Sequence, residues 1–192
     1  MSLSLPQPPA AALRAVLDAL DSPAALRALR SSATRRGPLA PAHPLPVHLL
    51  DPAAHADGAA PLSEARCTGW RFLIRDGEEV VAAAETRETP DGHAFAYFAE
   101  GPYPLATLRA LQQARQHTAA TSTPYLPRLL SVPGRYMTAL WLHPVLDQAR
   151  SRDLLIPLAP APLGVTAHVP HDAEELLTLL ALGRSALLPL AI

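Results

Sequence analysis

Lysine and asparagine are both absent from this chain of 192 residues, so arginine supplies all 16 basic side chains. The absence of lysine excludes a Schiff-base nucleophile, the phosphate-binding lysine of a Gly-rich loop and the lysine base of a Ser-Lys hydrolase. Lysine and asparagine codons are rich in A and T, and we interpret the bias mainly as the composition of a GC-rich genome. These absences narrow the chemistry without indicating a function.

Cysteine is almost absent as well, because Cys67 is the only one. No intrachain disulfide can form, and nothing indicates an oxidising compartment. A catalytic thiolate needs a nearby histidine to lower its pKa, and the sequence places none beside this residue. We therefore expect Cys67 to be a buried structural thiol.

Charge of one sign and long apolar runs are also lacking. The net charge of −1 gives no general attraction to nucleic acid or to an anionic membrane. The N-terminus has no basic leader and is interrupted by three prolines before any apolar run is long enough for a signal peptide. The most apolar stretch, residues 176–192, contains Gly183 and Arg184 and is shorter than the roughly 20 apolar residues that span a bilayer. The sequence predicts a cytoplasmic protein without nucleic-acid binding or membrane insertion.

Known catalytic and cofactor motifs are missing. The chain has no Gly-x-Ser-x-Gly elbow, no Gly-x-Gly-x-x-Gly and no P-loop. Among its eight histidines, His43, His48 and His55 lie in a proline-rich stretch with no cysteine or carboxylate at the spacing of a zinc site. We expect no metal, no cofactor and no catalytic residue.

Residues 1–36 are predicted to form an N-terminal helical arm. Four apolar residues recur at the i, i+3, i+4 and i+7 spacing of one helix face: Leu13, Val16, Leu17 and Leu20. A second, shorter helix is expected from Pro23, with Leu26 and Leu29 as its apolar face. Neither helix is long enough to be stable alone, so both faces need a surface to cover them.

Residues 37–63 are predicted to be a proline-rich spacer. Four prolines at positions 38, 41, 44 and 46 fix their own φ and push the preceding residues toward extended backbone. A stretch of this kind favours polyproline geometry and works as a stiff connector.

The remaining residues, 64–192, are predicted to form an α+β domain, of which residues 64–182 should fold without the first 60 residues. Residues 70–75 alternate with period two, the Asp76-Gly77 hairpin signal leads into a second strand over 79–87, and residues 93–99 follow a second turn as a third strand, which indicates a three-stranded antiparallel meander. A central helix is expected over residues 104–117, starting at a proline.

Further strands are expected over residues 126–132, 135–142 and 154–158, although the pattern of 135–142 also fits a helix. Asp172 and Glu175 form a capping box for a C-terminal helix, with Gly183 as its stop. The predicted fold class is therefore α+β: an antiparallel sheet of five or six strands with a central helix and a C-terminal helix, preceded by an N-terminal helical pair.

For function, we favour a non-enzymatic bacterial protein that assembles with another protein or with a second copy of itself as a homo-oligomer. The apolar stripe of Leu13, Val16, Leu17 and Leu20 is the expected partner-binding surface, because the spacer lets it reach beyond its own domain.

The alternative is a small-ligand-binding or hydrolytic domain that uses a hollow of the sheet. Its expected ligand-binding residues are Arg71, Tyr97, Arg128 and Trp141. An interaction protein would show an exposed apolar patch or an arm reaching off the body, whereas a ligand-binding domain would show a pocket with convergent polar groups.

Overall fold

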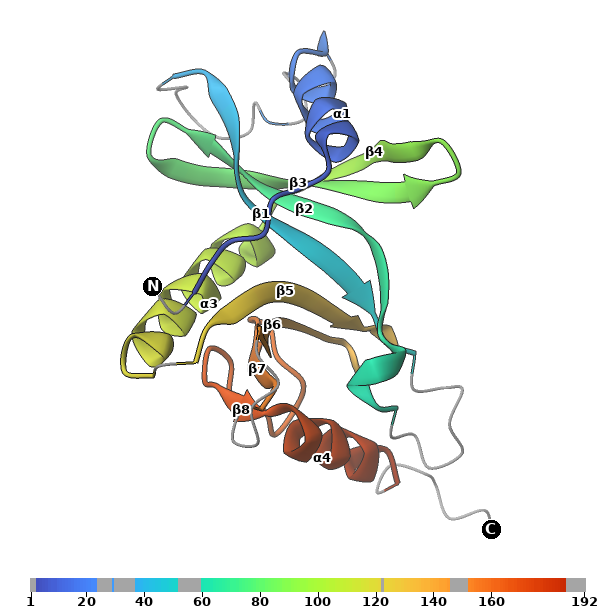
Figure 1. Cartoon of the computed structure of the whole chain (residues 1–192), viewed down its shortest axis with the longest axis vertical. Coiled ribbons are helices and arrows are strands. Elements are labelled where there is room, and N and C mark those ends of the chain that lie inside the picture. The colour runs from blue at the N-terminus through green and yellow to red at the C-terminus, as the bar shows by residue number, and fades with distance from the viewer. Residues whose placement is uncertain are drawn as a thin grey trace.

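The computed structural model describes residues 3–23, 29, 37–51, 60–121, 123–145 and 152–185, with side chains described up to residue 182. Eight strands form one sheet in the order β4-β3-β2-β1-β5-β6-β7-β8 (Figure 1). They are β1 (Leu39–Leu49), β2 (Arg66–Asp76), β3 (Glu79–Thr89), β4 (Gly92–Ala99), β5 (Tyr125–Val132), β6 (Met137–Pro144), β7 (Leu154–Pro157) and β8 (His171–Asp172). The described helices are α1 (Ala10–Leu20), α3 (Pro102–Ala119) and α4 (Ala173–Ser185), with short 3-10 helices η3 (Leu62–Glu64) and η4 (Pro133–Arg135). The predicted α+β class is confirmed, but the sheet has eight strands rather than five or six.

The meander β2–β3–β4 forms as the period-two pattern predicts, and all its pairs are antiparallel. Gly77, at a φ of 61°, makes the tight turn between β2 and β3. The stretch that also fitted a helix is a strand, because η4 (Pro133–Arg135) turns the chain and β6 then pairs with the whole of β5.

Strand β1 corrects the expected spacer, because it runs through the proline-rich stretch and lies inside the sheet. It pairs antiparallel with β2 over most of its length and parallel with β5 only from Val47 to Leu49. The prolines of β1 all precede this doubly paired part, so their missing N–H groups leave no gap in the β5 ladder. An irregularity between Ala42 and Leu45, with His43 at a φ of 47°, accommodates Pro44. The spacer prediction was wrong here because extended proline backbone also fits a strand that pairs on one side.

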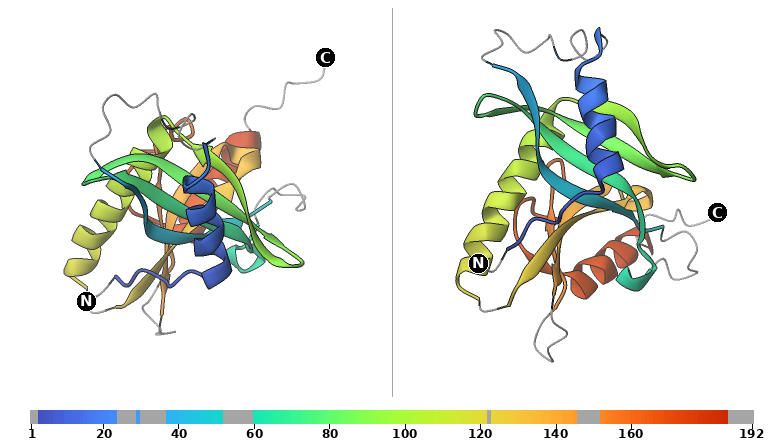
Figure 2. Two further views of the ribbon diagram at one scale, coloured as in Figure 1. Left: turned by 90° about the horizontal axis from the view of Figure 1, so that it is seen from above. Right: turned by 45° about the horizontal axis from the view of Figure 1, so that its top comes forward.

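The helices cover both faces of the sheet. Helix α3 packs on one face against side chains from both halves of the sheet, including Leu73, Leu129 and Leu140. On the opposite face, α1 packs against β2–β4 and α4 packs against β5–β7. Figures 1 and 2 show α1 and α4 at opposite ends of the molecule, with β1 and β5 between them. This arrangement leaves a strip of the sheet between α1 and α4.

The predicted helices are found in part. Helix α1 matches the first helix of the N-terminal pair, but most of the second one, residues 24–28 and 30–36, lies outside the described residues. Helices α3 and α4 are the predicted central and C-terminal helices, and α4 runs past Gly183 to Ser185. Within the described residues, no helix combines the length and apolarity needed to cross a membrane.

Candidate functional site

The predicted partner-binding stripe lies on α1 and faces the protein's own sheet. Val16 has no exposed surface, and Leu20 and Leu13 pack in the same cluster, against β2, β3 and β4. Leu17 is the exception, with 43% of its surface exposed. Helix α1 therefore covers its own domain rather than reaching off the body (Figure 1).

The four predicted ligand-binding residues form two pairs on opposite faces of the sheet. Arg71 and Tyr97 lie on the α3 face, where both contact Glu85 of β3. Arg128 and Trp141 are cross-strand neighbours of β5 and β6 on the other face. No single hollow brings all four together, because the two pairs lie on opposite faces of the sheet.

The Arg71 pair is an ion pair flanked by a tyrosine. The guanidinium of Arg71 donates to Oε1 of Glu85 through Nε at 2.8 Å and also through Nη2. Burial, together with the negative charge of Glu85 and a hydrogen bond to it, raises the pKa of Tyr97 to about 12. Tyr97 stays protonated at neutral pH and acts as a hydrogen-bond donor rather than a base.

The Trp141 side is a larger polar cluster. Oδ1 of Asp153 accepts a hydrogen bond from the indole Nε1 of Trp141 at 2.6 Å and lies 2.8 Å from Nδ1 of His143. The guanidinium carbon of Arg128 lies 4.7 Å from the Trp141 ring centre, within cation–π range. The ring of His48, from β1, meets the Trp141 ring edge-on at 5.3 Å. Four strands or strand ends thus supply one cluster.

Cys67 borders this cluster and is exposed rather than buried, which corrects the sequence prediction. It lies opposite His48 in the β1–β2 pairing, and its thiol points a weak hydrogen bond at the carbonyl of Gly69. Among the described residues, no three His, Cys, Asp or Glu side chains lie close enough together to hold a metal ion.

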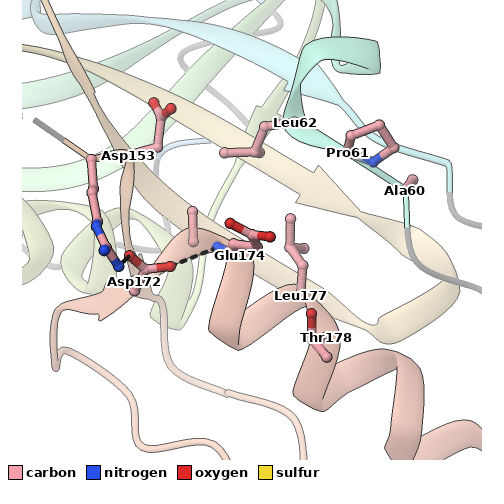
Figure 3. A pocket seen from close by; sticks show the side chains of 10 residues that line it. Ala60, Pro61, Leu62, Asp153, Asp172, Glu174, Leu177 and Thr178 are labelled. Carbon is pink, nitrogen blue, oxygen red and sulfur yellow. Dashed lines mark hydrogen bonds and ion pairs between the residues drawn. The ribbon is translucent and has the colours of Figure 1, made fainter. Parts of the chain in front are cut away.

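A pocket of about 640 Å³ opens beside the same aspartate. Figure 3 shows Pro61 and Leu62 on one side of it, Leu177 and Thr178 of α4 on the other, and Asp153 at one end. Arg152, Asp172 and Glu174 complete its polar lining. Asp153 is the link between the two features, since this residue lines the pocket and its carboxylate holds Trp141 and His143.

Asp172 is fixed at the first turn of α4. Its Oδ1 accepts hydrogen bonds from the backbone N–H groups of Glu174 and Glu175 at 3.0 and 3.2 Å, and Oδ2 accepts one from Arg152. Burial would raise the pKa of Asp172, but these bonds together with the charge of Arg152 outweigh burial and hold the pKa below its ordinary value. The predicted N-terminal cap of the last helix is thereby confirmed.

Most of these residues carry no signal that the sequence alone could reveal. His48 was expected in the proline-rich spacer. Asp153 comes near Trp141 only because the loop between β6 and β7 brings the start of β7 beside β6. His143 follows Trp141 by two positions, so the period of a strand alone would have placed the two on one face.

Comparisons with known proteins identify no relative. No family model, no curated protein and no solved structure matches the chain.

Proposed function

We propose that this protein binds a small molecule in the pocket between η3 and the first turns of α4. The observation that carries the proposal is Asp153, a residue at the end of a cavity of ligand size whose carboxylate two neighbours hold in place. A pre-positioned charged group in a pocket lowers the entropic cost of binding. We favour the ligand-binding alternative over assembly through α1, because the stripe that suggested a partner is covered by the protein itself.

The lining of the pocket favours a cation with an apolar part. Arg152 and Asp172 pair with each other at 3.2 Å, so the charges of Asp153 and Glu174 make the pocket negative. Pro61, Leu62 and Leu177 supply the apolar walls. The ligand class is therefore a small amphipathic amine.

Isothermal titration calorimetry with phenethylamine tests this proposal, with the neutral 2-phenylethanol as the comparison ligand. We expect saturable binding of the amine and weaker binding of the alcohol. Asp153→Asn should weaken amine binding about tenfold, the loss expected for one charged contact. The asparagine carbonyl can still accept the Trp141 N–H, so the fold should be kept.

Asp91→Asn is the matched control, because it makes the same charge change in the exposed turn between β3 and β4, away from the pocket. It should leave binding unchanged. Equal affinity of the wild type and Asp153→Asn, or no saturable binding of the amine, contradicts the proposal.

Assembly with a second copy of the chain is the second candidate. Leu179 and Leu182 lie three positions apart on the outer side of α4 and expose 51% and 67% of their surface. Two such helices packed about a two-fold axis would bury these leucines against each other. Sedimentation over a range of concentrations tests the idea: a dimer in the wild type that is lost in Leu179→Ser/Leu182→Ser supports it, and a monomeric wild type contradicts it.

A further inference from the structure

Three groups that carry or can carry positive charge meet on the strip of sheet between α1 and α4. They are Arg128 of β5, His143 of β6 and His48 of β1, gathered around the ring of Trp141. None of the three lines the pocket described above. The cluster therefore calls for its own explanation.

Arg128 is a half-buried cation without a counter-charge of its own. Within the described part of the chain its guanidinium makes no ion pair and no hydrogen bond, and its close contact is the Trp141 ring. Removal of a guanidinium from water is costly unless a partner replaces the water. Asp153 acts on Arg128 through its negative charge, but its Oδ1 is already shared between Trp141 and His143.

The two histidines are oriented around the same ring. His143 meets Trp141 at 5.6 Å between ring centres and turns Nδ1 toward Asp153, so its Nε2 is left for another partner. Burial lowers the pKa of His48, and the positive charge of Arg128 lowers it further. Protonation of His48 would therefore place a second positive charge beside Arg128, at an energetic cost that a bound anion would offset.

We propose that Arg128, His48 and His143 form a binding site for an oxyanion, the phosphate or carboxylate group of a small molecule. Planar guanidinium and imidazole N–H donors are the groups that proteins use for such anions. Among the residues that the structure describes, the charged and titratable groups that face the site are these three, the carboxylate of Asp153 and the thiol of Cys67. A bound anion favours the protonated form of His48, so binding should be tighter at pH 6 than at pH 8.

Inorganic phosphate and acetate are the probes, each titrated against sodium chloride at equal ionic strength. The histidine ring signals are followed by NMR at pH 6 and pH 8. We expect saturable shifts of His48 and His143 with at least one probe, and the tighter of the two tells phosphate from carboxylate as the preferred group. Arg128→Gln should weaken binding about tenfold, the loss of one charge-assisted hydrogen bond.

Arg87→Gln is the matched control, because Arg87 is an exposed arginine of β3 whose loss changes the net charge equally. It should leave the affinity unchanged. Arg128→Lys, which keeps the charge and loses the planar fork, should be intermediate and shows that the loss in Arg128→Gln is not misfolding. Shifts that do not saturate, or that persist with the same affinity in Arg128→Gln, overturn the proposal.

Discussion

Gly69 of β2 lies against the backbone of β3. A Cβ atom at this position would lie 1.9 Å from the backbone carbonyl oxygen of Thr86. Such contact with backbone cannot be relieved by turning a side chain, so one of the two strands must move. Thr86 also binds the backbone of Trp70, so the movement would reach the α1 side of the sheet.

Gly69→Ala should therefore destabilise the protein by about 3 kcal/mol, the upper part of the range for overpacking. Urea unfolding followed by circular dichroism measures this free energy. Gly37→Ala is the control, because the nearest atoms to its added Cβ lie at 3.7 Å, and it should change stability little. A Gly69→Ala variant as stable as the control would show that the strands can separate freely here.

At this scale, the sequence could predict types of contact but not partners. Arg128 and Trp141 were singled out as an aromatic and arginine pair, and they do stack, because the β5–β6 register sets them opposite each other. Arg71 and Tyr97 were grouped with them because the sequence does not tell which face of the sheet a residue of one strand shares with a residue of another. That information comes from the register of the pairing. Asp153 was missed, since a carboxylate between two strands carries no spacing signal.

Helix α1 is the element whose role changed most between sequence and structure. Its period of 3.6 correctly predicts an amphipathic helix, but periodicity does not tell whether the covering surface belongs to the same chain. The cover is the chain's own β2–β4, whose apolar face would otherwise be bare. The stripe is thus part of the core, apart from Leu17.

A matched pair of substitutions tests this assignment. Val16→Asp buries a carboxylate in an apolar cluster and should lower the free energy of unfolding by about 2–4 kcal/mol. Leu17→Asp places the same group at the exposed neighbour and should change stability by no more than about 0.5 kcal/mol. Thermal denaturation of both variants decides the matter. Similar melting temperatures would return α1 to the status of an undocked arm.

Strand β1 could not be predicted from local sequence patterns. The strands of the meander were predictable, since period-two alternation and glycine turns are local features of sequence. β1 lacks alternation, and its three prolines argue against a strand. The stretch is a strand because it pairs with β2 on one side and β5 on the other. Both partners are distant in the sequence, so local patterns do not reveal these pairings.

For the whole molecule, β1 is the strand that joins two halves of the sheet. Residues 64–192 alone would lack it, leaving β2 and β5 without the partner that lies between them. We expect this fragment to show no cooperative thermal transition, contrary to what the sequence alone suggested. A separate peptide of residues 1–63 should restore the transition when added. A sharp transition of the fragment alone would instead establish the boundary at residue 64.

The stability of the whole protein should fall as the pH drops from 7 to 5. Burial lowers the pKa values of His43, His48 and His168, so in this range the unfolded chain binds protons more readily than the folded one. The lowered pKa of Asp172 also reduces stability as the pH falls, but only near and below pH 4. Melting temperatures in zwitterionic buffers, which avoid phosphate, measure the effect. His48→Gln should flatten the profile, and an unchanged slope would remove His48 as a contributor.

The pairing of β1 with β5 also bears on how the chain is made. Val47 meets Leu129 about 80 residues later, so β1 has one open edge while the intervening residues leave the ribosome. An open strand edge is a template for pairing with other chains. Pro41, Pro44 and Pro46 lie just before the part of β1 that pairs with β5 and have no N–H group to donate, so we expect them to disfavour the pairing of this open strand with other chains. The same prolines that argue against a strand in the sequence would then limit wrong pairing of β1 until β5 has been made.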